Sequence, residues 1–124
     1  MSALIERVRL TAAAKQQLST LKRRTGIEHY NEIGRHALCI SLANKTSVPR
    51  EALSYGGGLE IDWKTFAGDA DATLTNLLMI RALADEGTAE PSAVRMVLHA
   101  HLHRGLSYLA SDPNSLSANL LTPR

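Results

Sequence analysis

The sequence is poor in cysteine, in aromatic residues and in long apolar runs, and each shortage excludes a class of protein. The single cysteine, Cys39, excludes an internal disulfide and any metal or iron–sulfur site built from the cysteines of one chain. Aromatic residues make up 4%, too few for a platform on which single-stranded bases stack. No stretch approaches the roughly 18 apolar residues of a membrane helix, and the first ten residues lack the apolar run of a signal peptide. We therefore expect a protein of the reducing cytoplasm that makes no contact with a membrane.

The net charge is only +2, but it is distributed unevenly along the chain. Residues 1–24 sum to +5, because six cations outnumber Glu6. Residues 51–90 sum to −6, because eight acids outnumber Lys64 and Arg81. A basic end and an acidic middle suit a protein that binds an anion on one face and another protein elsewhere.

Basic residues are concentrated in residues 7–24, which contain no acidic residue. On a helix, Ala14, Leu18 and Leu21 fall on one apolar stripe that would face the core. The cations would then face water, as they do in proteins that bind a nucleic-acid backbone. A solvated surface that only maintains solubility explains the same charges equally well. The candidate DNA-binding residues are Lys15, Lys22, Arg23 and Arg24 on the helix, with Arg7, Arg9 and Lys45 flanking it.

The hydrophobic spacing predicts a mainly α fold, a single domain over residues 1–124 with about four helices and a short N-terminal strand. Thr11 should cap the first helix and Asp69 or Asp71 the helix that follows the loop region, while Gly26 and Gly87 should end the same two helices. We divide the chain into a basic strand–helix–helix half (1–44), a loop region (45–70), a helical half (71–111) and a tail (112–124). We expect strands at 4–10 and 59–63, helices at 12–24, 28–43, 71–85 and 92–110, and a loop at 44–58.

Three alternating histidines, His99, His101 and His103, form the most conspicuous motif. Because the flanking pattern is helical, His99 and His103 would be neighbours while His101 would point the other way. Two histidines four residues apart hold a metal only with a third ligand, and no glutamate stands between them as in HExxH. We therefore expect no metal, with His101 facing the core or a subunit contact and the others making polar or phosphate contacts beside Arg104. A metal-dependent nuclease that uses His99 and His103 is the alternative from another functional class.

No other pattern indicates catalysis or a cofactor. The run Gly56-Gly57-Gly58 lacks the lysine, the serine or threonine and the helix of a phosphate loop, so a turn is the simpler interpretation. No serine lies within the glycine pattern of a nucleophile elbow. Cys39 should pack at the edge of its helix, one turn after His36, where a thiol is usually inert. We expect neither catalytic residues nor cofactors.

Four segments of the chain carry a resemblance to a known family. LKRRTGI (21–27), RHALCISLA (35–43), EIDWKTFAGD (60–69) and HLHRGLSYLA (101–110) resemble the DndE family of DNA sulfur-modification proteins. The segments occur in the order of the family and together span nearly the whole chain. The resemblance implies a part in DNA phosphorothioation, in which sulfur replaces a non-bridging phosphate oxygen.

The resemblance also implies a subunit that has no catalytic activity of its own and that binds double-stranded DNA, notably at nicks. Partner proteins of the phosphorothioation system would supply cysteine desulfuration, an iron–sulfur adenylating activity and an ATPase. A homo-oligomer is implied as well, for which we expect a tetramer. The long apolar stripes of residues 74–83 and 94–109 predict an oligomer independently, because a small core does not need them all.

The order of the first elements also resembles a ribbon–helix–helix unit, in which two chains pair their strands and the ribbon reads the major groove. Arg7 and Arg9 would then face the groove. Repressors of this fold are short, whereas some eighty residues follow the second expected helix of this chain. A ribbon–helix–helix repressor of its own operon is therefore the alternative within the DNA-binding class.

Overall fold

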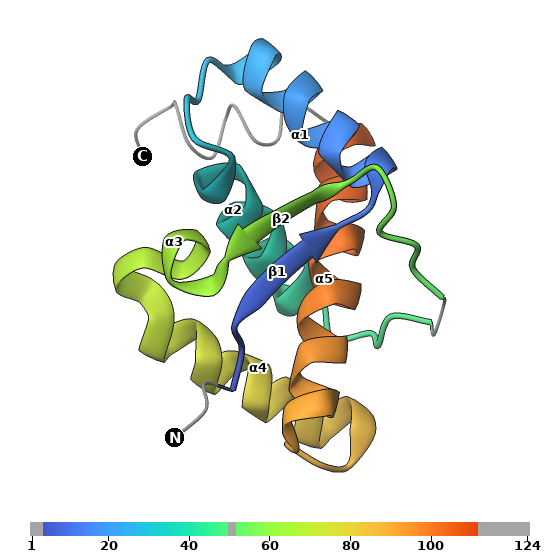
Figure 1. The fold of residues 1–124 in the computed structure, drawn as a ribbon. Coiled ribbons are helices and arrows are strands. Elements are labelled where there is room, and N and C mark those ends of the chain that lie inside the picture. Colours follow the sequence, from blue (N-terminus) through green and yellow to red (C-terminus); the bar gives the residue numbers. More distant parts are fainter. Residues whose placement is uncertain (1–3, 50–51, 112–124) are drawn as a thin grey trace.

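The computed structural model describes residues 4–49 and 52–111, and within them the fold is mainly helical with one two-stranded sheet (Figure 1). This confirms the expected fold class. Most boundaries lie within two residues of those predicted, and the first strand is three residues shorter at its start. The elements are β1 (Arg7–Leu10), α1 (Ala12–Thr25), α2 (Tyr30–Ala43), β2 (Leu59–Asp62), α3 (Trp63–Ala67), the 3₁₀ turn η1 (Gly68–Ala70), α4 (Asp71–Glu86) and α5 (Pro91–Ser111).

The two strands form an antiparallel pair that lies across the helices (Figure 1). Arg9 stands opposite Glu60 in the register. Val8 and Leu10 are buried while Arg7 and Arg9 are exposed, which confirms the predicted alternation. The sheet therefore has one face on the core and one basic face in water.

The pairing of β1 with β2 of the same chain differs from a ribbon–helix–helix dimer, in which that strand pairs with a second chain. The order β1–α1–α2 matches the expectation. One edge of β1 is nevertheless taken by β2, and α5 covers the other edge, as described below. The geometry thus gives no support to the repressor alternative.

α5 is the longest helix, and it contacts α1, α2, α4 and β1 (Figure 1). Leu98, Leu102 and Leu106 repeat every four residues along α5 and are completely buried. This spacing places them on one face of α5, and the helix as a whole packs most extensively against α2. Trp63 and Phe66 of α3 stack 5.8 Å apart and enclose another part of the same core.

Most of the predicted helix ends are confirmed. The Thr11 hydroxyl accepts a hydrogen bond of 3.1 Å from the N–H of Ala14, and Gly26 and Gly87 end α1 and α4. The predicted cap of α4 is wrong, because neither Asp69 nor Asp71 caps it. The Asp71 carboxylate is instead used by two side chains, accepting hydrogen bonds from Trp63 Nε1 at 2.7 Å and Thr75 Oγ1 at 3.2 Å.

The region between β2 and α4 also differs from the expectation. The predicted strand 59–63 ends at Asp62, and Trp63 begins the short helix α3. Burial of Trp63, Phe66 and Ala67 explains this, since a turn of helix brings all three onto one side. The predicted tail, 112–124, lies outside the described residues.

Candidate nucleic-acid interface

The exposed side of α1 carries four of the seven predicted DNA-binding residues. The side chains of Lys15, Lys22, Arg23 and Arg24 are all exposed, and α1 contains no acidic residue. Its opposite side is buried through Ala14, Leu18, Leu21 and Thr25. At about 100° per residue, Lys15 and Lys22 share one flank, Arg23 points away from the core and Arg24 lies on the other flank. The cations therefore spread over the whole solvent-facing half of α1.

Lys22 lies next to the beginning of α2. Its Nζ is 5.1 Å from the centre of the Tyr30 ring, a distance at which a cation and an aromatic face attract each other. The Tyr30 hydroxyl is in turn 3.1 Å from Ser19 Oγ, one turn before Lys22 on α1. These contacts hold the lysine at the junction of the two helices while its side chain remains exposed.

Arg7 and Arg9 form a second basic group on the water-facing side of the hairpin. Glu60 of β2 lies between them, with carboxylate oxygens 3.2 Å from Arg7 Nε and 3.9 Å from Arg9 Nε. The Arg9 guanidinium also lies 4.6 Å from the centre of the Tyr55 ring. Because these side chains are about half exposed, water screens both ion pairs, and each contributes at most about 1 kcal/mol.

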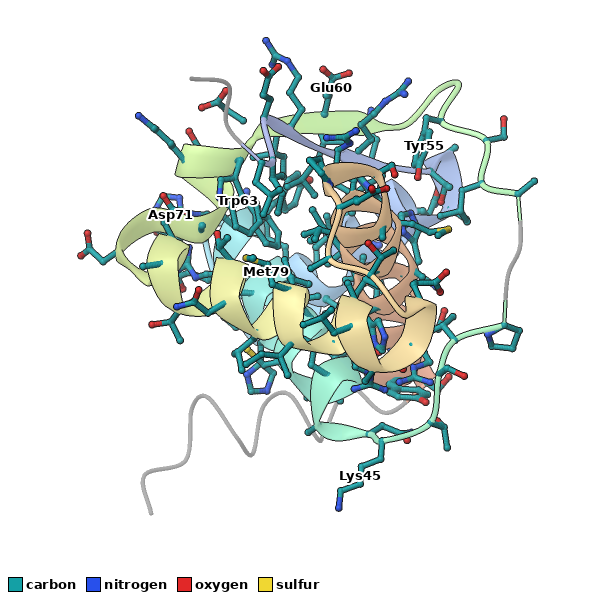
Figure 2. The ribbon with its side chains drawn as sticks, turned by 90° about the horizontal axis from the view of Figure 1, so that it is seen from below. Lys45, Tyr55, Glu60, Trp63, Asp71 and Met79 are labelled. Atoms are coloured by element: carbon teal, nitrogen blue, oxygen red, sulfur yellow. The ribbon has the colours of Figure 1, made fainter. Side chains whose placement is uncertain are left out.

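Lys45 is separated from the hairpin arginines. It follows α2 and is exposed. Figure 2 shows Lys45 at the opposite side of the molecule from Glu60, the residue that lies between Arg7 and Arg9. The structure therefore does not bring Lys45 together with the strand residues that were predicted to act with it.

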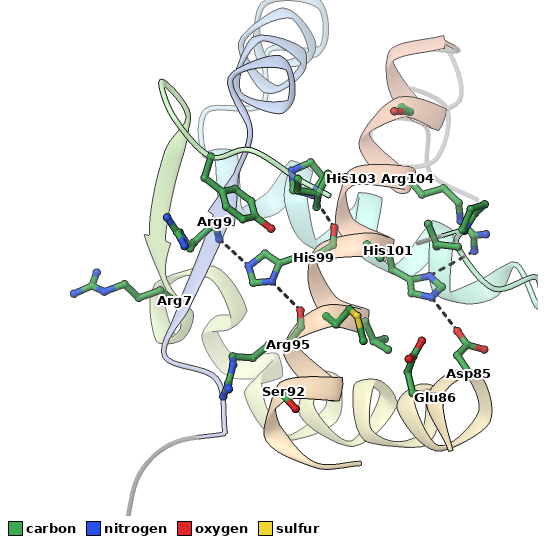
Figure 3. A pocket seen from close by; sticks show the side chains of 18 residues that line it. Arg7, Arg9, Asp85, Glu86, Ser92, Arg95, His99, His101, His103 and Arg104 are labelled. Carbon is green, nitrogen blue, oxygen red and sulfur yellow. Dashed lines mark hydrogen bonds and ion pairs between the residues drawn. The ribbon is translucent and has the colours of Figure 1, made fainter. Parts of the chain in front are cut away.

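Arg95 is a cation near the hairpin that sequence reasoning missed. It is exposed on α5, where its Nη1 lies 3.3 Å from the carbonyl oxygen of Leu4. With Arg7 and Arg9 it lines one side of a cavity of about 890 Å³ between α5 and the segment that follows α2 (Figure 3). No local sequence pattern could reveal this, because more than eighty residues separate Arg95 from Arg9.

His99 and His103 cover the outer edge of β1. His99 Nε2 accepts a hydrogen bond of 3.0 Å from the backbone N–H of Arg9, and His103 Nε2 accepts one of 3.2 Å from that of Thr11. The Nδ1 atom of each ring is 2.8 Å or less from the carbonyl oxygen four residues earlier in α5, that of Arg95 or of His99 (Figure 3). A carbonyl oxygen only accepts, so both rings are neutral with the proton on Nδ1.

These hydrogen bonds occupy both nitrogens of each ring. A metal binds the unprotonated nitrogen, which in His99 and His103 already accepts a backbone N–H. No group of three histidine, cysteine or acidic side chains within residues 4–49 and 52–111 is placed to hold a metal ion. The geometry thus does not favour the nuclease alternative, which needs His99 and His103 as ligands.

His101 points the other way, into the core, as the sequence predicted. Its Nδ1 is 2.8 Å from Ser41 Oγ and its Nε2 is 3.4 Å from Asp85 Oδ2. Arg104 donates from Nε to Ser41 Oγ, and Arg81 donates from Nε to Asp85 Oδ2. The Ser41 hydroxyl is completely buried and held from two sides, so it connects α2 to α5 and is not presented to a substrate.

Arg104 and Arg81 bind the end of α2 and the segment that follows it. Arg104 also donates to Ser41 O and to Thr46 Oγ1, and Arg81 donates to the carbonyl oxygens of residues 42, 44 and 46. Polar or phosphate contacts of His99 and His103 were expected beside Arg104. The Arg104 guanidinium itself binds groups of the protein. Burial is the main cause that lowers the pKa of the neighbouring His101.

The remaining motifs have structural roles or none. Gly58 lies against the backbone of Leu10 with no room for a side chain, and its N–H bonds to Tyr55 O, which confirms the turn interpretation of the glycine run. Cys39 is exposed on α2, although it was expected to pack at the edge of that helix. His36 is partly buried, and desolvation lowers its pKa.

Within the described part of the chain, no helix has the length and apolar character needed to cross a bilayer.

Comparison with known proteins identifies the family. The family model described as DNA sulphur modification protein DndE matches residues 7–117. The fold is similar to a crystal structure of DndE from Escherichia coli B7A, described as involved in DNA phosphorothioation modification, with a TM-score of 0.71 and 25% sequence identity over 87% of this chain and 99% of that one. No curated protein matches the chain. The chain therefore belongs to the DndE family of DNA sulphur modification proteins, and this membership supports its involvement in DNA phosphorothioation.

Proposed function

We propose that the protein is a non-catalytic subunit of a DNA phosphorothioation system that binds double-stranded DNA through its phosphates. The observation that carries this proposal is the solvent-facing half of α1, where Lys15, Lys22, Arg23 and Arg24 are exposed without an acidic neighbour on the helix. Such a surface attracts a polyanion. Binding is favoured because it releases counterions that are condensed on the nucleic acid. Modification of phosphate groups requires proteins that recognise the backbone, and this surface suits that task.

The geometry of α1 favours contacts with phosphates over contacts with bases. Lys15 and Lys22 are seven residues apart, which is about 10 Å along the helix axis. One DNA strand advances about 3.4 Å per nucleotide, so two such lysines reach phosphates a few nucleotides apart. Lysine is a flexible point charge that binds a phosphate well but lacks the planar fork with which arginine reads guanine. We therefore expect binding without strong sequence preference.

The hairpin arginines are a second basic group that can bind phosphates in addition to α1. Arg7 and Arg9 hold their guanidinium groups in water, restrained by weak ion pairs with Glu60. A DNA phosphate can replace these ion pairs at little cost, because screening already weakens them. Arg95 lies beside them and adds a further cation. Lys45, on another side of the molecule, would reach DNA only in a larger assembly.

Several contacts support the absence of catalysis by this chain. The buried Ser41 hydroxyl is already hydrogen-bonded to His101 and Arg104, and so it is poorly placed to attack a substrate. The rings of His99 and His103 are engaged with β1. Cys39 is exposed, but burial of part of its side chain raises the pKa of the thiol, which disfavours the reactive thiolate. We assign the chemistry to the other proteins of the system.

An apolar stripe on α4 supports a homo-oligomer. Leu77, Ile80 and Leu83 are 43%, 64% and 56% exposed, and they lie on the side of α4 that faces away from the core. A contact between copies would remove these side chains from water. We propose a tetramer in which the α1 surfaces of several copies contact one DNA molecule, with other proteins of the system as further partners.

Binding to three forms of DNA tests this function. Affinity for intact duplex, for the same duplex with one nick and for single strands should be measured at two salt concentrations. We expect duplex binding that weakens steeply with salt, tighter binding at the nick, and little preference among random sequences. Preference for one operator by about 10³-fold would favour a repressor, and equal affinity for single strands would contradict the proposal.

A further inference from the structure

We infer that His99 and His103 are positioning residues that hold β1 and the start of α1 in place for DNA, and that they do so only while both rings are neutral. The inference rests on the proposed DNA-binding function, which it deepens by naming a pair of residues that controls the basic surface. Neither histidine belongs to that surface itself. Both act through the backbone of β1 and of Thr11, to which their rings are bonded.

The two rings replace a third strand at the outer edge of β1. Alternate residues of a strand direct their N–H groups to opposite sides, so those of Val8 and Leu10 face β2 while those of Arg9 and Thr11 face α5. The rings accept hydrogen bonds from these two outward N–H groups, at 3.0 and 3.2 Å. An edge strand without such partners would show unpaired backbone groups.

The hydrogen bonds at Arg9 and Thr11 control both basic groups, the hairpin arginines and the exposed side of α1. Arg9 carries one of the exposed guanidinium groups of the hairpin. Thr11 is the residue that caps α1, with its hydroxyl bonded to the N–H of Ala14. Releasing the two N–H groups would therefore loosen the strand arginines and the first turn of α1 together.

Protonation of the rings would break this arrangement. Each Nδ1 already carries a proton that is donated to a carbonyl oxygen of α5, so a second proton must go to Nε2. A protonated Nε2 faces the N–H of Arg9 or Thr11 and no longer accepts from it. Both hydrogen bonds from the backbone to the rings are then lost. Each protonated Nε2 becomes a donor that faces another donor, the backbone N–H of Arg9 or of Thr11.

The surroundings of His99 oppose its protonation. Arg9, Arg95 and His103 carry or can carry positive charge near His99, and among the described residues no carboxylate influences the pKa of its ring. Tyr55 packs against both rings, with centroids 5.7 Å from His99 and 6.2 Å from His103. Burial is the largest cause that lowers the pKa of His99, with the neighbouring cations acting in the same direction and the bond to Arg95 O opposing them.

The predicted effect of acid on DNA affinity has an unusual sign. Protonating a histidine near DNA ordinarily adds positive charge and strengthens binding. Here protonation would release β1, so affinity should fall as the pH falls below the ordinary histidine pKa of about 6.5. The two mechanisms thus give opposite slopes, and the measured slope distinguishes them.

Two variants separate the acceptor from the proton. In the double variant His99→Gln/His103→Gln, the amide oxygen can accept from the same N–H but does not titrate. In His99→Phe/His103→Phe, the ring shape is kept and the acceptor is removed. His29→Gln is the matched control. His29 is an exposed histidine that follows α1 in the sequence, whereas β1 precedes α1.

The experiment measures amide hydrogen exchange at Arg9 and Thr11, together with duplex affinity, at about pH 7.5 and about pH 5.5. After correction for intrinsic exchange, wild type should lose at least about tenfold protection at these two amides in acid, with Val8 and Leu10 less affected, and its affinity should fall in parallel. The glutamine pair should keep protection and affinity at both pH values, the phenylalanine pair should lack protection at both, and the control should follow wild type.

Two results would overturn the inference: protection that does not change with pH in wild type, or the same acid loss in the glutamine pair. Poor folding of the phenylalanine pair would not affect the comparison between wild type and the glutamine pair. If no variant binds DNA at any pH, the proposed function fails. The exchange data alone then decide whether the rings hold β1, so the two failures are distinguishable.

Discussion

Gly105 of α5 lies directly against the backbone of Ala37 in α2. A methyl group at Gly105 would overlap the carbonyl oxygen of Ala37, and the oxygen belongs to a helix that cannot move aside without disturbing the core. Both residues are buried, and α2 and α5 have the most extensive contact of any two elements in the described part of the chain. This close approach brings Ser41 and His101 within hydrogen-bonding distance, and it holds α5 in the place from which its other histidines reach β1.

Gly105→Ala should therefore destabilise the fold, although alanine is the better helix former. Overpacking of this kind costs about 1–3 kcal/mol, more than the gain of about 1 kcal/mol from helix propensity. The free energy of unfolding in urea is the measurement. Ser107→Ala, at an exposed position of the same helix, should change it by about 0.5 kcal/mol or less. Equal stability of the two variants would show that α2 and α5 are not so closely packed.

Asp71→Ala should destabilise the region between β2 and α4. The substitution leaves the indole N–H of Trp63 without its acceptor at 2.7 Å, and Trp63 is 5% exposed. A lost bond to a charged group costs about 1.5–3 kcal/mol. Tryptophan fluorescence during urea unfolding reports both the stability and the surroundings of the indole. Asp71→Asn, which keeps an acceptor, should lose less, and the exposed Asp69→Ala should behave as wild type.

Ile80→Asp should dissociate the proposed oligomer without unfolding the chain. Ile80 is the most exposed large apolar side chain of α4, at 64%, so a carboxylate there costs little in a monomer but cannot be buried unpaired in a contact between copies. Light scattering at micromolar concentration measures the mass. Ser54→Asp adds the same charge at another exposed position and should leave the mass unchanged. A wild-type protein that is itself monomeric would contradict the proposed assembly.

Local features of the fold could be predicted from the sequence because neighbouring residues determine them. The cap at Thr11, the ends at Gly26 and Gly87, and the alternation along β1 each depend on a few adjacent residues. The basic side of α1 follows in the same way from one apolar stripe and one charged side, since a helix separates the two.

Long-range partners could not be predicted in this way. The pairing of β1 with β2 joins segments some fifty residues apart, and His99 meets Arg9 across ninety. His99 and His103 could be considered metal ligands from the sequence because it shows only their spacing. It does not show the edge of β1, whose N–H groups bind their ring nitrogens. The sequence likewise placed Arg104 beside polar or phosphate contacts of the two histidines, whereas its guanidinium binds Ser41 at the end of α2 and Thr46 in the segment after it.

The salt dependence of duplex binding by Lys22→Ala tests the central claim most directly. If Lys22 holds a phosphate, log affinity should fall with log salt by about 0.9 less per unit than in wild type, and every duplex sequence should weaken similarly. Lys64→Ala, which removes an exposed lysine of α3, is the matched control and should leave the slope unchanged. An unchanged slope in Lys22→Ala, or a loss of binding confined to one sequence, would contradict phosphate binding by α1.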